Sequence, residues 1–185
     1  MIRLVGSVGT DHHPFPRFLE WVSVAVERLG VEAFVQRGAT PDRAGLETVD
    51  YLPAEELQAA MERADVVVCH GGPGTIAGAI RCGHRPIVIA RDPLQGEHVD
   101  DHQQRYTRKL GDEGTIDLPA DLEAFLTLVG AARPRDVAAI ASNAEAATEA
   151  ITRSALHFGG LVDDLLAGRA PRRRWRDRML VRRVP

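Results

Sequence analysis

A strand, a glycine loop and the start of a helix are expected in the stretch Val66-Val67-Val68-Cys69-His70-Gly71-Gly72-Pro73-Gly74-Thr75-Ile76. The apolar run predicts the strand, and the glycines and proline behind it predict a turn into the helix. Such a junction gathers backbone N–H groups and the positive end of a helix around one point, where an anion can bind. The stretch therefore predicts an anion site at the carboxyl end of this strand.

The segments on either side continue the alternation of strands and helices. The continuous apolar run at 86–90 is typical of a strand buried on both faces of a parallel sheet. The expected fold class is therefore α/β, with a single Rossmann-like, open, doubly wound parallel sheet and C-terminal helices. The predicted strands are 2–6, 33–36, 47–52, 65–69, 86–90 and 114–117. The predicted helices are 14–29, 54–63, one from the glycine loop to 82, 100–110 and 122–129.

Length and composition fit one soluble α/β domain. The chain has 185 residues, of which 44% are hydrophobic and 26% charged, and no apolar stretch reaches the roughly 18 residues needed to cross a bilayer. The N-terminal residues run directly into a predicted strand, so neither a signal peptide nor a membrane anchor is expected. Cys69 and Cys82 lack CxxC spacing and fit thiols kept reduced in a cytoplasm.

The charge is distributed unevenly along the chain. Residues 169–185 hold eight arginines against Asp177, a net charge of +7, which leaves −10 on the rest. The expected organisation is a Rossmann-like domain over 1–130, helices over the alanine-rich segment 135–168, and this basic tail over 169–185. Docking to a partner or to anionic lipid is the favoured interpretation of the tail. A solvated tail and nucleic-acid binding are the alternatives, and the acidic body argues against nucleic acid.

Three loops are expected at one edge of the sheet, 6–13, 70–75 and 91–104, because ligands of doubly wound folds bind beyond the carboxyl ends of the strands. The loop at 70–75 lacks the lysine and the following Ser/Thr of a P-loop, and Gly6-Ser7-Val8-Gly9 does not complete GxGxxG. A diphosphate cradle without a dedicated cation remains. The helix dipole, backbone amides and the Thr75 hydroxyl would neutralise a leaving nucleotide there.

A second polar segment is Glu97-His98-Val99-Asp100-Asp101-His102-Gln103-Gln104. His98 and His102, four apart, could share a metal ion, but HExxH is missing and the carboxylates suit a helix cap near Asp100. Gln103 and Gln104 favour sugar recognition, because an amide offers both a donor and an acceptor to vicinal hydroxyls. No metal is expected, although the metal alternative stays open.

Histidines outside that segment are harder to interpret. His12 and His13 precede Pro14, where a solvated loop pair is the plain interpretation and a general base is the functional one. His12 is the candidate base. His84 and His157 have no functional context and are expected at the surface.

These segments resemble the C-terminal, donor-binding half of GT-B glycosyltransferases of family 28. They are more closely similar to the small catalytic subunit of split UDP-sugar transferases. Its eukaryotic form adds the second N-acetylglucosamine to dolichol-diphosphate-N-acetylglucosamine, and its bacterial forms act in exopolysaccharide synthesis. The matching pieces are Val8-Gly9-Thr10 with Pro14-Phe15, His70-Gly71-Gly72-Pro73-Gly74-Thr75-Ile76, Pro86-Ile87-Val88 and Glu97-His98-Val99-Asp100-Asp101-His102-Gln103.

The resemblance implies an inverting, metal-independent transfer from a UDP-sugar, with no cofactor. The diphosphate and nucleotide would meet Gly9, Thr10, His70, Gly71, Gly72, Gly74 and Thr75. The donor sugar would meet Glu97, His98, Asp101, His102, Gln103 and Gln104.

The resemblance also implies a partner, because a GT-B enzyme needs a second half to bind its acceptor. A membrane-associated acceptor-binding subunit would hold the chain at the cytoplasmic face of the membrane, next to a lipid-linked acceptor. One residue departs from the pattern, since Gly78 stands where full-length relatives carry a glutamate that grips the ribose. The alternative is therefore a non-catalytic nucleotide-sugar-binding or scaffold subunit that has lost activity.

Overall fold

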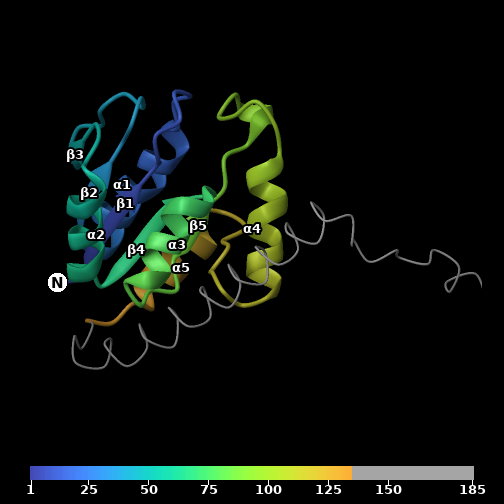
Figure 1. Ribbon diagram of the computed structural model, residues 1–185. Coiled ribbons are helices and arrows are strands. Elements are labelled where there is room, and N and C mark those ends of the chain that lie inside the picture. Colours follow the sequence, from blue (N-terminus) through green and yellow to red (C-terminus); the bar gives the residue numbers. More distant parts are fainter. Residues whose placement is uncertain (135–185) are drawn as a thin grey trace, which may run out of the picture. The chain divides into compact units, whose positions relative to one another are not determined.

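The computed structural model describes residues 1–134, which all lie in the first compact unit of the chain, Met1–Ala147. The core is a five-stranded parallel sheet with the strand order β3-β2-β1-β4-β5 (Figure 1). The strands are β1 (Arg3–Ser7), β2 (Glu32–Gln36), β3 (Glu47–Val49), β4 (Val66–His70) and β5 (Ile87–Ile89). The expected α/β class and open parallel sheet are confirmed.

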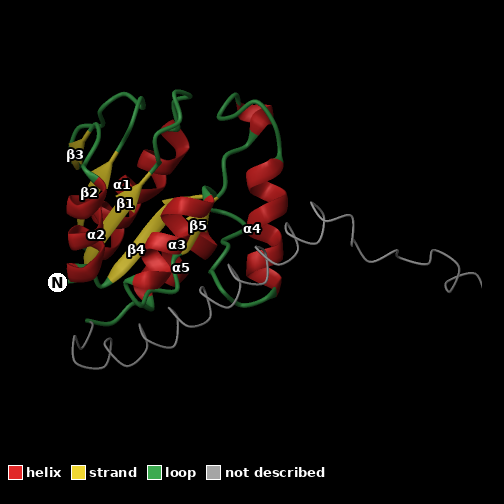
Figure 2. Ribbon diagram, in the orientation of Figure 1, coloured by secondary structure: helices red, strands yellow, loops and turns green. Residues whose placement is uncertain are grey.

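Helices connect the strands, except for the loop between β2 and β3, and they cover both faces of the sheet (Figure 2). Proline at the first position starts α1 and α3, and Asp121 caps α5 by accepting a hydrogen bond from the Ala124 N–H. The helices are α1 (Pro16–Leu29), α2 (Ala54–Arg63), α3 (Pro73–Arg81), α4 (His102–Asp112) and α5 (Leu122–Gly130), with a short 3₁₀ helix η1 (Pro93–Gln95).

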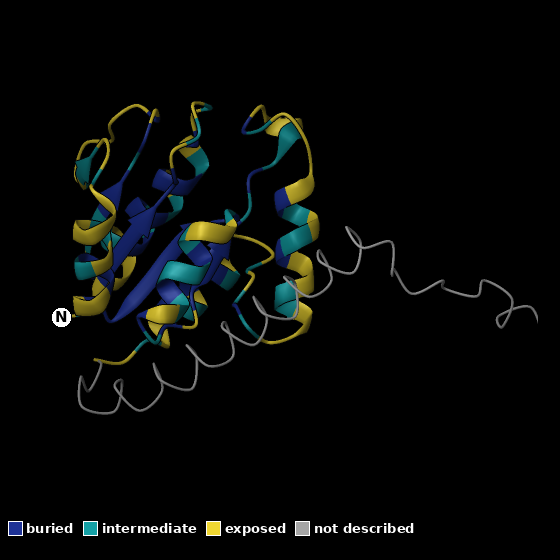
Figure 3. Cartoon of the chain, viewed as in Figure 1, coloured by how far each residue is buried: buried dark blue, intermediate teal, exposed yellow. Residues whose placement is uncertain are grey.

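The strands β1, β4 and β5 are largely buried between two apolar layers and are dark blue in Figure 3, whereas β3 at the edge is not buried. Successive side chains of a strand point to opposite faces. Val66 and Val68 of β4 pack in the cluster that includes α1 and α5, whereas Val67 packs with α2 and α3. Cys69 joins a third cluster with α3 and α4, where burial raises the pKa of its thiol to about 12. Both faces of β4 are therefore core.

Several predicted boundaries are corrected. The strand expected at 114–117 is only an isolated parallel bridge between Ile87 and Asp117. Helix α4 begins at His102 rather than at residue 100, and η1 was not predicted. His84 is not at the surface: it is buried, and its Nε2–H donates to the Met61 carbonyl at 2.7 Å. The predictions for 135–168, for the tail 169–185 and for His157 lie outside the described residues.

The strand order fixes where a ligand can enter. The chain builds outward from β1 to β3, then crosses back to place β4 on the other side of β1, so the connections leave β1 and β4 in opposite directions. The loops that follow β1 and β4 part at this switch point, and in doubly wound folds the ligand-binding crevice lies at this position, outside the carboxyl edge of the sheet. Among residues 1–134, no helix is long and apolar enough to cross a membrane.

Candidate functional site

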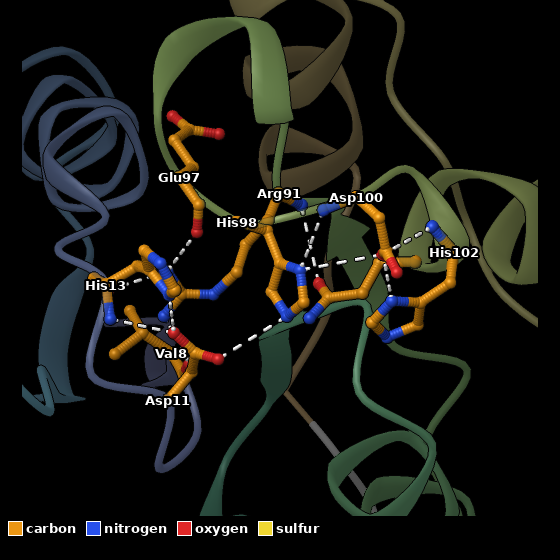
Figure 4. A network of polar contacts seen from close by, with 9 residues as sticks. Val8, Asp11, His13, Arg91, Glu97, His98, Asp100 and His102 are labelled. Carbon is orange, nitrogen blue, oxygen red and sulfur yellow. Dashed lines mark hydrogen bonds and ion pairs between the residues drawn. The ribbon is translucent and has the colours of Figure 1, made fainter.

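Three loops meet at the carboxyl edge, and the Arg91 side chain joins two of them, the loops after β1 and β5 (Figure 4). Its Nη1 donates to the carbonyls of His13 at 2.7 Å and Glu97 at 2.9 Å, and its Nη2 donates to the carbonyl of Val8 at 3.0 Å. The side chain is completely buried, with its guanidinium 4.8 Å from the centre of the Phe15 ring. Arg91 therefore fixes the loop after β1 against the loop after β5.

Arg91 is a buried cation held by backbone oxygens. Burial lowers its pKa, while the nearby carboxylates of Asp11 and Glu97 act in the opposite direction. Sequence reasoning missed this residue, because an arginine at the end of a strand usually reaches solvent. The available signal was its place directly after a strand predicted to be buried on both faces.

Glu97 braces the same loop. Its carboxylate accepts hydrogen bonds from Arg17 at 2.7 and 3.0 Å and from the Asp92 N–H at 2.8 Å, and the residue is only 2% exposed. Arg17, on α1, also donates to the Ala90 carbonyl. Both carboxylate oxygens of Glu97 already accept hydrogen bonds within the protein. A sugar hydroxyl, as predicted for Glu97, would have to share one of these oxygens.

His70 lies at the switch point between Gly9 and Gly72. A Cβ atom on Gly9 would fall 2.3 Å from His70 Cε1, and one on Gly72 would fall 2.1 Å from Nε2. The ring Nδ1–H donates to the Ser7 carbonyl at 3.4 Å. Burial, with help from Arg91, lowers the pKa of His70 to about 4, so the imidazole is neutral at physiological pH. The two glycines are what leave room for it.

The glycine loop leads directly into α3. Gly72 is the extended N-cap residue, Pro73 follows, and no side chain caps this end. The N–H groups of Gly74 and Thr75 have no partner within the helix, since the first intrahelical donor is Ile76. Gly74 is exposed and nothing lies within 4 Å of its Cβ position. These donors are available to an anion at the crevice.

The two glutamines lie on different sides of α4. Gln103 is 4% exposed and packs against Gly71, with its Oε1 accepting the Arg91 N–H at 3.4 Å. Gln104 bonds instead to Asp92, and it lines a separate cavity of about 500 Å³ that also includes Trp21. Adjacent helical positions diverge by about 100°. Only Gln103 therefore lies beside the glycine loop.

A chain of histidines and aspartates borders the crevice (Figure 4). The His13 Nδ1–H donates to Asp11 at 2.6 Å, and His98 Nε2 lies 3.4 Å from the other Asp11 oxygen. On its other side His98 Nδ1 is 3.6 Å from Asp100, which also contacts His102. Burial disfavours ionised Asp11, but hydrogen bonds from His13 lower its pKa below the usual value. The Asp11–His13 pair was not predicted from the sequence.

The remaining predicted residues lie at the rim. Thr10 and His12 are exposed, and the His12 ring is 4.0 Å from that of His13. Asp101 pairs with Arg105 one turn along α4 at 3.1 Å, and makes no capping hydrogen bond. The His102 N–H is bonded by Asp100 instead, at 3.1 Å. The helix-capping role expected for the carboxylates therefore falls to Asp100.

Comparison with known proteins agrees with this geometry. Residues 32–152 match the glycosyltransferase family 28 C-terminal domain. The chain belongs to this family. No curated protein matches the sequence. The expected resemblance is thus confirmed at the level of the family.

Two solved glycosyltransferase structures have an architecture similar to that of this family 28 domain. The chain is similar to CalG4, the calicheamicin glycosyltransferase, with a TM-score of 0.56, 14% identity and 89% of this chain covered. It is equally similar to the glycotransferase of kitacinnamycin, with a TM-score of 0.56, 18% identity and 92% covered. The chain spans 44% of the length of each. At these identities the likeness shows the GT-B C-domain fold.

Proposed function

We propose that this family 28 domain is the donor-binding subunit of an inverting, metal-independent, two-component glycosyltransferase. It would move a hexose-type sugar from a UDP-sugar to a polyprenyl-diphosphate-linked acceptor of the exopolysaccharide type. The observation that carries the proposal is the uncapped start of α3 at the switch point, with Gln103 beside it. The free N–H groups at the start of α3 would bind the diphosphate, and a sugar attached to it would lie next to the side-chain amide of Gln103.

The chemistry follows from these groups. The acceptor oxygen attacks the anomeric carbon from the face opposite UDP, and the bond between that carbon and the diphosphate oxygen breaks with its electrons leaving on UDP. The Gly74 and Thr75 N–H groups and the Thr75 hydroxyl stabilise the departing diphosphate without a metal ion. The acceptor proton needs a base, and His12, exposed at the rim, is the proposed one.

The proposed partner is a membrane-associated, acceptor-binding subunit at the cytoplasmic face. The chain spans less than half of CalG4 and of the kitacinnamycin enzyme, and the proposal assigns acceptor binding to a separate subunit. A lipid-linked acceptor stays in the membrane, so the subunit that binds it would bring this domain to the bilayer surface.

Calorimetric titration of the purified chain tests donor binding. UDP, GDP and TDP are compared first, then UDP-glucose, UDP-glucuronate and UDP-N-acetylglucosamine, each with and without EDTA. We expect selective UDP binding that EDTA does not change. Thr75→Val should weaken it by about tenfold, the value of one hydrogen bond to a charged group. Thr127→Val, on α5, is the matched control and should bind like the wild type. Failure to bind any uridine nucleotide would contradict the donor role.

A non-catalytic nucleotide-sugar-binding or scaffold subunit is the second candidate, and Gly78 favours it. Packing does not require a glycine there, since the nearest atom to its Cβ position is Arg81 Nη2 at 3.8 Å. The ribose-binding glutamate implied by the resemblance is therefore absent although there is space for it. Under this candidate the chain binds UDP-sugars but shows no turnover with the acceptor subunit, and Gly78→Glu strengthens nucleotide binding.

A further inference from the structure

The His98-Val99-Asp100-Asp101-His102 segment joins the loop after β5 to α4. One ligand atom from each of His98, Asp100 and His102 lies within 4.8 Å of the others. His98 approaches Asp100 through Nδ1 at 3.6 Å, and His102 contacts the same carboxylate oxygen through its own Nδ1. Two imidazole nitrogens and one carboxylate oxygen thus converge at a single point.

A second observation concerns the far side of the His98 ring. Its Nε2 lies 3.4 Å from Asp11 Oδ2, and Asp11 is itself held by the His13 N–H at 2.7 Å and Nδ1–H at 2.6 Å. Histidines that bind a metal through one nitrogen usually donate the other N–H to a carboxylate, which fixes the ring and strengthens the ligand. The Nε2 atom of His98 approaches the Asp11 carboxylate in this way. Its Nδ1 atom carries the free lone pair, accepts the Asp100 N–H at 3.4 Å and faces the Asp100 carboxylate.

We propose that His98, Asp100 and His102 bind a divalent transition-metal ion of the zinc class. Imidazole and carboxylate together suit Zn²⁺, Ni²⁺ or Co²⁺, whereas Mg²⁺ and Ca²⁺ prefer ligand sets made of oxygen. The His98 side chain is 11% exposed, against 55% for Asp100 and 47% for His102. One side of the site is therefore open, which leaves coordination positions for water.

The bound ion would act on the loop and not on the transfer reaction. It would join the first turn of α4 to the loop after β5 and, through Asp11, to the loop after β1. This inference does not rest on the proposed function, because metal binding is measured without nucleotide or acceptor.

The competing explanation is a hydrogen-bonded cluster that needs no ion. Asp100 already accepts the His102 N–H at 3.1 Å and would keep doing so without metal. The two explanations differ in what they predict for added Zn²⁺, so the test measures the ion directly.

The experiment uses the full chain without a histidine tag, stripped with EDTA and exchanged into buffer. It is titrated calorimetrically with ZnCl₂, NiCl₂, MgCl₂ and CaCl₂, and bound zinc is counted by mass spectrometry after gel filtration. We expect one Zn²⁺ per chain, tight enough to survive gel filtration, weaker or equal Ni²⁺ binding, and no detectable Mg²⁺ or Ca²⁺.

Variants locate the ion. Asp11→Asn should weaken Zn²⁺ binding about 10- to 100-fold, as expected for the partner of a ligand. Asp100→Asn and His102→Gln remove ligands and should lose on the order of 100-fold or more. Asp101→Asn, an adjacent carboxylate that pairs with Arg105, is the matched control and should keep the wild-type zinc affinity. Circular dichroism confirms that each variant is folded.

Three outcomes would overturn the site. One is a wild-type chain that binds no Zn²⁺ after exchange. Another is zinc affinity that falls no further in Asp100→Asn than in Asp101→Asn. The third is zinc binding retained in His102→Gln and lost in His12→Gln, which would place the ion in the neighbouring Asp11, His12 and His13 group.

Discussion

The imidazole of His70 fits at the end of β4 because Gly9 and Gly72 carry no side chains. At Gly72 the backbone has ordinary dihedral angles, with φ of −79°, so any residue could adopt them. What excludes a larger residue is the His70 ring, 2.1 Å from the Cβ position. Gly74, two positions later, has open space and no such restriction.

Alanine substitutions can distinguish the crowded position, Gly72, from the open one, Gly74. We expect Gly72→Ala to lower the free energy of unfolding by about 1–3 kcal/mol, the usual cost of overpacking. Gly74→Ala, the matched control, should not lower it. Urea denaturation measures both. In the His70→Ala background the Gly72→Ala penalty should largely vanish, and a penalty that persists there would show that the ring is not the obstacle.

The low pKa of His70 gives stability a pH dependence. The unfolded histidine titrates near its ordinary value of 6.5, whereas the folded one stays neutral down to about pH 4. Between these values the unfolded state binds the extra proton, so stability rises with pH and is lost as pH falls from 6.5 to 4. The loss attributable to His70 is on the order of 3 kcal/mol.

The test compares urea unfolding of the wild type and His70→Asn at pH 4.5 and pH 7. The stability gap between the two proteins should narrow at the lower pH, because asparagine does not titrate. An equal gap at both values would mean that the folded imidazole is protonated as readily as the unfolded one.

At the scale of the elements, helix α3 contains two glycines, Gly74 and Gly78. Gly78 lies inside it with space around its Cβ position. Glycine in a helix interior costs about 1 kcal/mol relative to alanine, so Gly78→Ala should stabilise the protein by roughly 0.5–1 kcal/mol. Ala77→Gly, the reverse change next to it, should destabilise by a similar amount. Thermal unfolding checks both, and a destabilising Gly78→Ala would reveal a contact that the open space does not suggest.

Most helices and strands could be predicted, because the spacing of their apolar residues follows which faces are buried. The apolar run at β5 and the helical spacing of α1 and α2 follow from which faces are covered. The segment 114–117 could not, because its β propensity is met by a single bridge to Ile87 rather than by a ladder. A bridge and a short strand look alike in sequence.

At the scale of the molecule, Arg91 holds two loops that are far apart in the chain. Replacing it by methionine would fill the volume but leave the carbonyls of Val8, His13 and Glu97 without their donor. We expect Arg91→Met to cost about 3 kcal/mol or more in urea denaturation, since each buried group left unsatisfied costs about 1–3 kcal/mol. Hydrogen exchange in the loop after β1 should also accelerate.

Arg28→Met is the matched control for this change. Arg28 pairs with Glu123 at 2.8 Å on the exposed surface, and such a pair contributes at most about 1 kcal/mol. Equal losses in the two variants would show that Arg91 does not fasten the loops.

The meeting of three loops was predictable, but the partners of their side chains were not. Parallel strands bring 6–13, 70–75 and 91–104 to one edge whatever the loops contain. A sugar contact remains the prediction for Glu97, whereas its hydrogen bond with Arg17, a residue 80 positions away, was not predicted. Gln103 and Gln104 looked equivalent, and only helix phase separates them. Which partner a side chain contacts depends on distances in the folded protein, and these cannot be obtained from residue types.

The strand order also has a consequence for synthesis on the ribosome. β1 emerges first but occupies the middle of the sheet, so one of its edges stays unpaired until β4 has been made. The bond from Arg91 to Val8 spans 83 residues, and Gln103 follows later still. A nascent chain therefore exposes an apolar strand edge from the synthesis of β1 until residue 70 of 185 has been added, a period in which it is prone to aggregate and to engage chaperones. The loops at the carboxyl edge cannot be completed before Gln103 has been added to the chain.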